Sequence, residues 1–216
     1  MLDYITINDH SSIRIEAERI LYFDPFRFNA DFQPHDADVI FVTHDHFDHY
    51  SPEDIAKILK DETQFVAPTS TAALIAEAFP QFASQIIAVK PGDTLQVAGI
   101  DVEVVAAYNP TKEQFHPKRE NWVGYVVTAE GKRHYICGDM DVTEEGKNVK
   151  CDVLLLPVGG TYTMDAKEAI ELVSAIQPAY AIPTHYGEVA GGEACGSVFA
   201  EEISKAGLAT EVVMKL

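Results

Sequence analysis

The chain has 216 residues, of which 47% are hydrophobic and 23% are charged, a composition typical of a globular protein with its own core. Sixteen Lys and Arg residues face 34 Asp and Glu residues, and the resulting net charge of -18 would repel a phosphate backbone, so we expect no nucleic-acid partner. Since no stretch of about 18 apolar residues occurs, we also expect no membrane partner and a soluble, cytoplasmic protein.

The beginning of the chain alternates apolar and polar residues in three short runs, at residues 4–7, 13–15 and 19–23. A period of two predicts strands, and the turn-forming residues at 8–12 indicate an antiparallel meander. Residues 37–43 are mostly apolar and predict a buried strand. Ser51 followed by Pro52 then predicts the first turn of a helix. Residues 44–49 therefore lie on a loop between a strand and a helix.

The remainder of the chain repeats the pattern of meander followed by strand and helix. We expect helices at 70–78, from Asp165 to Ile176 and shortly before 211, and strands at 86–89, 94–97, 101–107, 122–127, 134–137, 153–156, 180–183 and 211–214. Because both halves share this order, the sequence predicts an α/β fold of two stacked mixed β-sheets with helices outside them. No linker-like stretch interrupts it, so we expect residues 1–216 to form a single domain.

The loop at residues 44–49 carries a dense group of metal-binding side chains. It reads His-Asp-His-Phe-Asp-His, so that His44, His46, Asp48 and His49 lie within six positions. At this spacing, alternate side chains can point at one ion while the adjacent pair turns toward a second ion. Imidazole and carboxylate ligands together suit zinc. Alternatively, the four residues are ordinary polar residues of a solvated loop, but such a pattern seldom arises by chance.

A His-x-His-x-Asp-His loop after a buried strand resembles the signature of the metallo-β-lactamase superfamily. Three further segments resemble motifs of this superfamily in the same order: Asp24 in Phe-Asp-Pro, Asp139 in Cys-Gly-Asp and His185 in Pro-Thr-His. The resemblance implies a four-layer αββα sandwich, a metal-dependent hydrolase activity and a site for two divalent metal ions. Zinc is the expected metal, with manganese or iron as alternatives.

The resemblance also implies a role for each residue of the site. The first ion would be bound by His44, His46 and His116, and the second by Asp48, His49 and His185. Asp139 would lie between the two ions, and Asp139 and Asp48 are the expected catalytic carboxylates. Asp24 would support the histidine loop from behind and orient a ligand.

The sequence departs from the family pattern at the third ligand of the first ion. The family usually has a histidine directly after the strand, where this chain has Asn109. His116 follows seven residues later and could fold back. We therefore expect His116 to be the metal ligand. Asn109 would then contact either the substrate or one of the metal-binding side chains, without binding the metal itself. If His116 is instead an ordinary loop residue, the first site is weak. His10 and Tyr162 are further candidates for the substrate pocket, each with a purely structural role as the alternative.

Other segments resemble the branch that includes the L-ascorbate 6-phosphate lactonases, among them His10-Ser11-Ser12 and Tyr162-Thr163-Met164-Asp165. The implied reaction is the attack of a metal-bound hydroxide on a small lactone, ester or phosphodiester, either neutral or anionic. One alternative is a metal-binding protein of the same fold with little or no catalysis. A redox di-iron protein is the weaker alternative, because the di-iron branch usually carries Glu in place of His46. Whether the protein is a homo-oligomer stays open.

Overall fold

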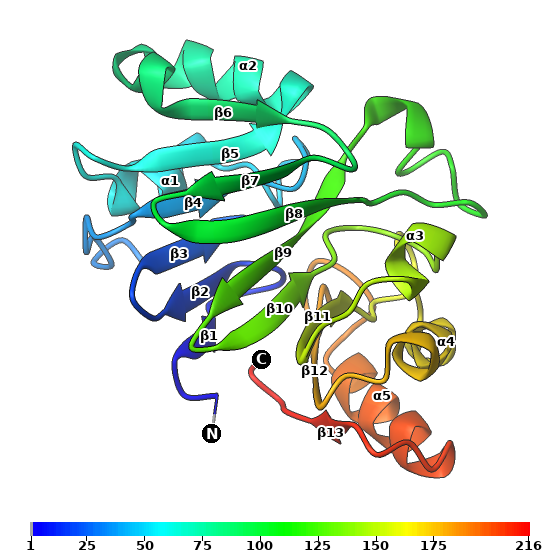
Figure 1. Cartoon of the computed structure of the whole chain (residues 1–216). Helices are drawn as coiled ribbons and strands as arrows, with labels where there is room; N and C mark the ends of the chain where they lie inside the picture. Colours follow the sequence, from blue (N-terminus) through cyan, green and yellow to red (C-terminus); the bar gives the residue numbers. More distant parts are fainter. Residues whose placement is uncertain (1) are drawn as a thin grey trace.

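Figure 1 shows the computed structural model of the chain, which describes residues 2–216. Two mixed β-sheets face each other and helices cover their outer faces, so the expected four-layer α/β sandwich is confirmed. Within the described residues, the first sheet pairs in chain order β1 (Ile5–Ile7), β2 (Ile13–Glu16), β3 (Ile20–Phe23), β4 (Val39–Phe41), β5 (Gln64–Pro68) and β6 (Ile86–Val89). The second sheet likewise pairs β7 (Thr94–Val97), β8 (Ile100–Ala106), β9 (Val123–Ala129), β10 (Lys132–Ile136), β11 (Val153–Pro157), β12 (Tyr180–Thr184) and β13 (Glu211–Val212).

The helices form the two outer layers. The first sheet is covered by α1 (Pro52–Ile58), α2 (Thr69–Ala78) and the 3-10 helix η1 (Pro80–Gln85), and the second by α3 (Glu144–Lys147), α4 (Ala166–Ile176) and α5 (Ala194–Lys205). A short 3-10 helix, η2 (Lys118–Glu120), precedes β9. The predicted caps are confirmed, because the side chains of Ser51 and Asp165 accept backbone N–H groups at the starts of α1 and α4. No helix among residues 2–216 has both the length and the apolar character needed to cross a membrane.

Alternating side chains of the strands build the three apolar layers of the core. On β11, Val153 and Leu155 point between the two sheets, whereas Leu154 and Leu156 pack with α4 and α5. These four side chains are at most 1% exposed. Burying one Leu side chain contributes about 2 kcal/mol. The strands are therefore held firmly from both faces, and the loops at their ends start from fixed positions.

The strand β5 was missed by the sequence prediction. It lies between β4 and β6 and is parallel to both of them. Its residues are buried on both faces after the first, so its sequence shows no alternation of apolar and polar residues. It also ends in Ala67 and Pro68, which seldom occur in strands, and runs directly into α2. Neither of these signals separates such a strand from the beginning of a helix.

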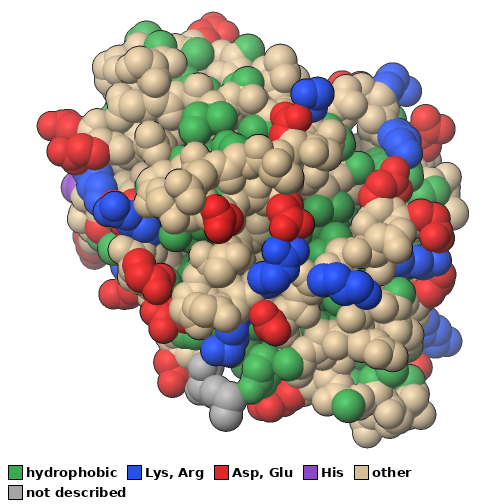
Figure 2. Space-filling view, in the orientation of Figure 1, with side chains coloured by type: hydrophobic (Ala, Val, Ile, Leu, Met, Phe, Trp, Pro, Cys, Tyr) green, Lys and Arg blue, Asp and Glu red, His purple; other side chains and the backbone are tan. Residues whose placement is uncertain are grey.

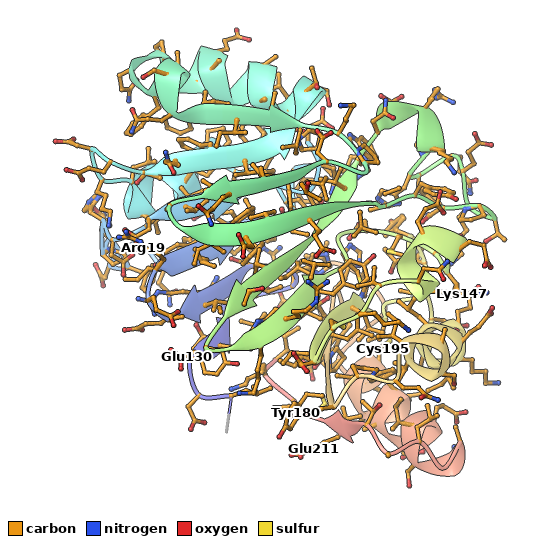
Figure 3. The ribbon with its side chains drawn as sticks, in the orientation of Figure 1. Arg19, Glu130, Lys147, Tyr180, Cys195 and Glu211 are labelled. Carbon is orange, nitrogen blue, oxygen red and sulfur yellow. The ribbon has the colours of Figure 1, made fainter. Side chains whose placement is uncertain are left out.

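Parallel pairing brings the carboxyl ends of several strands to one edge of the sandwich. β3, β4 and β5 are parallel neighbours in the first sheet, as are β10, β11 and β12 in the second. Asp24, Asp139 and His185 directly or closely follow β3, β10 and β12, and the histidine loop follows β4. Arg19 and Glu130, labelled in Figure 3, mark the opposite edge. The fold thus gathers the predicted site residues at one edge.

A histidine away from this edge gives the fold a testable dependence on pH. His134 on β10 is fully buried, and its Nε2 lies 2.9 Å from the hydroxyl of Tyr4. Burial lowers the pKa of His134 from 6.5 to about 4. Between pH 6.5 and 4 this histidine binds more protons in the unfolded chain than in the folded one. Its contribution to the stability of the fold is therefore complete above pH 6.5 and is lost as the pH falls toward 4. The loss amounts to about 3 kcal/mol.

We expect the metal-free protein with His134→Gln to show a flatter decline of the free energy of unfolding between pH 6.5 and 4 than the wild type. Urea denaturation at a series of pH values measures both slopes. Because other histidines titrate equally in both proteins, the difference between the slopes isolates His134. Parallel curves for the two proteins would show that His134 does not titrate as stated.

Candidate metal centre

The histidine loop begins directly after β4 and is held in a tight turn. The backbone N–H groups of His49 and Tyr50 both donate to the carbonyl of His46, at 3.0 and 2.9 Å. The turn directs His44 and His49 into the molecule, where each residue is at most 1% exposed. Their ring centroids lie 4.0 Å apart. His46 stays half-buried at the mouth of the site.

The first cluster of metal-binding side chains consists of His44, His46, His116 and Asp139. One ligand atom of each residue lies within 4.8 Å of all the others. His116 Nε2 is 3.2 Å and His44 Nε2 is 3.9 Å from Asp139 Oδ2. The structure therefore brings His116 to the predicted position of the third ligand.

The second cluster consists of His10, Asp48, His49 and His185, again with one atom of each within 4.8 Å of the others. His185 Nε2 and His49 Nε2 are 3.9 and 4.0 Å from Asp48 Oδ2, and His10 Nε2 is 3.2 Å from it. Burial raises the pKa of Asp48, but the adjacent His10 and His49 outweigh burial and lower it to about 2. Asp48 is thus ionised throughout the neutral range.

Asp139 joins the two clusters. Its Oδ2 is 2.8 Å from His185 Nε2 and its Oδ1 is 3.2 Å from His49 Nε2, both in the second cluster. Its Oδ2 also lies 3.2 Å from Nε2 of His116, which is in the first cluster. Burial by itself raises the pKa of Asp139, but the facing His185 and His49 hold it well below its ordinary value. An ionised carboxylate therefore stands between the two clusters.

Asp24 supports the histidine loop from behind. Its Oδ1 accepts the backbone N–H of Thr43 at 2.8 Å, and its Oδ2 accepts the Thr43 hydroxyl at 2.8 Å. Oδ2 also lies 2.7 Å from Nδ1 of His49. Because this contact engages Nδ1, the other ring nitrogen of His49 faces Asp139. Asp24 thus occupies the predicted supporting position.

The protonation states of the histidines suit metal binding. Burial, together with the neighbouring His49, holds the pKa of His44 well below its ordinary value. Burial also lowers the pKa of His46. His49 differs, because Asp139 and Asp24 outweigh its burial and raise its pKa well above the ordinary value. At neutral pH, His44 and His46 are therefore neutral donors, and a metal would displace a proton from His49.

Several buried atoms of the two clusters have no partner within residues 2–216 at the angles of a hydrogen bond, although each histidine nitrogen among them lies within 3.2 Å of a carboxylate oxygen. They are His10 Nε2, His49 Nε2, His116 Nε2, His185 Nε2 and Asp139 Oδ1. Buried polar atoms are rarely left without partners in native proteins. Imidazole nitrogens and carboxylate oxygens that converge in this way suit a borderline cation such as zinc. The residues present therefore fit a pair of divalent ions.

The loop that carries His116 explains how this residue reaches the site. The backbone N–H of Asn109 donates to the carbonyl of His116 at 2.8 Å, which closes the loop between them. The side-chain Nδ2 of Asn109 lies 3.1 Å from His116 Nδ1. Asn109 is fully buried and, unlike His116, is not among the residues that line the cavity next to the clusters, so it lies behind the ligand. Of its two expected roles, its position favours the contact with the ligand over the contact with substrate.

His10 lies elsewhere than expected. The sequence placed it in the substrate pocket, but it is fully buried within the second cluster. Its backbone adopts a φ of 55°, and its carbonyl accepts the backbone N–H of His185 at 3.0 Å. This contact holds the two residues together, with ring centroids 3.9 Å apart. Nothing in the sequence pattern revealed this pairing, because the two residues are distant along the chain.

A cavity of about 310 Å³ opens onto both clusters. It is lined by His46, Phe47, Asp48, Phe115, His116, Asp139, Tyr162, His185 and Val189. Tyr162 is 39% exposed and lies on the wall, where the sequence placed it, although its contact with substrate stays a prediction. The aromatic residues Phe47 and Phe115 were not predicted. Their only signal is proximity in sequence to His46 and His116, which does not indicate where a side chain points.

Trp122 contacts two histidines of the first cluster and lines a second, larger cavity. Its ring lies 4.9 Å from that of His44 and 4.7 Å from that of His46, between centroids. Trp122 also lines a cavity of about 540 Å³ beneath β8 and α3. Two of the cations there are already paired, Arg133 with Glu103 at 2.7 Å and Lys118 with Glu145 at 2.8 Å. Figure 2 likewise shows acidic side chains spread over the visible face, many of them beside Lys or Arg. The larger cavity contains neither metal-binding cluster, so the smaller one is the candidate active site.

Comparison with known proteins agrees with this geometry. A model of the β-lactamase superfamily domain matches residues 4–185. A UPF0173 metal-dependent hydrolase of Thermoplasma acidophilum is 33% identical over 186 residues, which cover 82% of this chain and 80% of the relative. Another UPF0173 metal-dependent hydrolase, of Methanopyrus kandleri, is 30% identical over 223 residues, which cover 97% of this chain and 95% of the relative.

Solved structures share the fold over nearly the whole chain. A protein of Parabacteroides distasonis described as a metal-dependent hydrolase is 28% identical, with a TM-score of 0.80 over 98% of this chain and 92% of its own. The fold also extends to CmlA, a di-iron β-hydroxylase of Streptomyces venezuelae, at 13% identity and a TM-score of 0.75 over 98% of this chain and 52% of CmlA. The matches in sequence and structure agree: the chain belongs to the metallo-β-lactamase superfamily and, within it, to the UPF0173 metal-dependent hydrolases.

Proposed function

We propose that the chain hydrolyses a small molecule with the help of two divalent metal ions bound at the two clusters. The first ion would be held by His44, His46 and His116, and the second by Asp48, His49 and His185. Asp139 would contact both ions, and His10 would contact the second ion or Asp48. The observation that carries the proposal is the convergence of two compact ligand clusters on one buried, ionised carboxylate.

Divalent cations at such a site polarise a carbonyl or phosphoryl oxygen and activate water at neutral pH. The residues of the chain would set the conditions for this chemistry. Asp48 and Asp139 would offset part of the positive charge of the ions. Asp24 would fix the His49 ring, and the cavity of about 310 Å³ would admit a small lactone, ester or phosphodiester. Zinc is the metal that this ligand set suits best, with manganese and iron as alternatives.

The test is turnover with and without metal. Purified protein is stripped with a chelator, reconstituted separately with zinc, manganese and iron, and assayed on a panel of lactones, esters and phosphodiesters. We expect hydrolysis of at least one class by the reconstituted protein and none by the stripped protein. The result would contradict the proposal if turnover were absent from all reconstituted forms or unchanged by stripping.

The same assay separates the alternatives. Stoichiometric metal binding without any hydrolysis would favour a metal-binding protein. Dioxygen consumption by the iron-loaded form without hydrolysis would favour redox chemistry, which the shared fold with a di-iron β-hydroxylase makes worth measuring. Neither alternative is supported by a specific feature of the site, because His116 lies within the first cluster and the chain has His46 where the di-iron branch usually carries Glu.

The assignment of the third ligand is tested by two variants. We expect His116→Ala to release one of the two ions, because it removes a direct ligand of the first. Asn109→Ala should keep both ions but weaken binding of the first by about tenfold, since it removes the support of His116 and the hydrogen bonds to the carbonyls of Lys112 and Tyr162 but no ligand. Competition with a chromogenic chelator measures both stoichiometry and affinity. Loss of an ion from Asn109→Ala, with both ions kept in His116→Ala, would reverse the assignment.

A further inference from the structure

The walls of the candidate active site are apolar beyond the metal-binding side chains. Phe47, Phe115, Tyr162 and Val189 complete the lining, and none of the lining residues within the described chain is Lys or Arg. Phe47 is 70% exposed although it is a large apolar side chain. A single exposed apolar side chain is common on a protein surface, but Phe47 also lines the cavity. Its position at the mouth of the cavity makes the substrate the natural partner.

The aromatic rings of the lining each contact another aromatic ring. The rings of Phe115 and Tyr162 meet edge to face, with centroids 5.0 Å apart. Phe47 packs edge to face on Phe26, with centroids 6.0 Å apart. The two pairs come from loops that are distant in sequence but both border the cavity. An aromatic group of a substrate would therefore meet preformed apolar surfaces.

Two basic side chains on adjoining segments are already paired. Arg27, whose guanidinium lies 5.2 Å from the Phe26 ring, contacts Asp9 at 3.4 Å and Glu188 at 3.3 Å. Lys112 contacts Asp141 at 2.8 Å and also Glu168 at 3.2 Å. With a net charge of -18 around them, these groups do not present free positive charge to the cavity.

We propose that this pocket selects substrates whose group beside the scissile bond is uncharged and apolar, such as an aryl or branched alkyl group. A phosphate or carboxylate on the aromatic side of the cavity would lose its hydration against aromatic faces, which carry negative partial charge, and would find no Lys or Arg side chain in return. The proposal rests on the proposed hydrolase function and narrows it. Of the neutral and anionic substrates that the sequence left open, the pocket favours the neutral ones.

A matched pair of lactones tests this selection on the zinc-loaded protein. γ-Phenyl-γ-butyrolactone and γ-carboxy-γ-butyrolactone share the same ring, and in both water adds across the acyl C–O bond to give a hydroxy acid. Each rate is divided by the rate of hydrolysis in alkali, which corrects for intrinsic reactivity. We expect kcat/KM to be at least about tenfold higher for the phenyl compound, the effect of removing roughly 60 Å² of apolar surface from water. Equal values, or a preference for the carboxy compound, would overturn the proposal.

A variant of the exposed ring adds a second readout. Phe47→Ala should raise KM for the phenyl lactone by about tenfold and change KM for the carboxy lactone less than about twofold. The control is Phe32→Ala, because Phe32 is also an exposed phenylalanine, 38% accessible, but packs on Phe28 away from the cavity. Phe32→Ala should leave both values unchanged. Equal effects of Phe47→Ala on both lactones would contradict the inference.

Binding of the products separates this inference from the proposed reaction. Calorimetry on the zinc-loaded protein compares 4-hydroxy-4-phenylbutanoate with 2-hydroxyglutarate, the products of the two lactones. We expect the phenyl product to bind at least about tenfold more tightly, even if neither lactone is hydrolysed. If turnover is found but the charged product binds equally well or better, the selection is wrong while the hydrolase function stands. Absence of binding by both products would also overturn the selection.

Discussion

Replacing Asp139 with Asn is expected to lower metal-dependent turnover by at least about 100-fold while the protein still folds cooperatively. Loss of a carboxylate that only supports a metal ligand already costs about 10–100-fold in affinity or activity. Asp139 is placed more directly, because its oxygens lie within 3.2 Å of nitrogens in both clusters. The amide would remove the negative charge between two cations without changing the size of the side chain. Steady-state kinetics at full metal loading, with thermal unfolding as the measure of folding, checks the result.

Asp45→Asn is the matched control for this variant. Asp45 lies on the same histidine loop and is half-buried, but it belongs to neither cluster. It should retain turnover within about twofold, because its side chain is in neither cluster and does not line the cavity. Wild-type turnover by a fully loaded Asp139→Asn protein would be incompatible with a bridging carboxylate.

Replacing Asp24 with Asn is expected to damage both the fold and the second ion site. Three donors converge on the carboxylate: the backbone N–H and hydroxyl of Thr43, and His49 Nδ1. An amide offers one oxygen, so at least one donor would face an NH₂ group, at a cost of about 2 kcal/mol. This corresponds to a fall in Tm of roughly 5 °C for the metal-free protein. The His49 ring would also lose its orientation, which should lower the affinity for the second ion by about 10–100-fold.

The control separates the loss of stability from the loss of metal. Asp36 is also a supporting carboxylate, paired with Arg14 at 2.9 Å and bonded to the Tyr22 hydroxyl at 2.8 Å, but it is remote from the clusters. Asp36→Asn should lower Tm and leave metal affinity unchanged. Calorimetric unfolding and chelator competition provide the two readouts. Unaltered metal affinity in Asp24→Asn would show that Asp24 supports only the fold.

The sequence predicted the parts of the site that depend on short motifs. The histidine loop, Asp139 and His185 follow strands whose apolar runs are easy to identify, and parallel pairing then brings these strand ends together. The caps Ser51 and Asp165 were found for a similar reason, because capping depends on neighbouring residues alone. The spacing of the histidine loop thus indicated metal binding by itself, whereas the roles of Asp139 and His185 came from their resemblance to family motifs.

The remaining features depend on contacts between distant segments. His10 joins the second cluster through a backbone hydrogen bond to His185, which no local pattern encodes. Asn109 lies behind His116 because the loop between them closes on itself. The exposure of Phe47 is likewise set by how the turn at 46–50 orients alternate side chains. Such placements require the folded chain, since identical residues on a differently closed loop would face elsewhere.

The central claim is that the two side-chain clusters hold two metal ions per chain. Elemental analysis of protein reconstituted with zinc and then freed of loosely bound metal measures this most directly. We expect two zinc ions per chain in the wild type and one in His116→Ala. A wild-type content that stays below one ion per chain, after reconstitution with zinc, manganese or iron in turn, would contradict it.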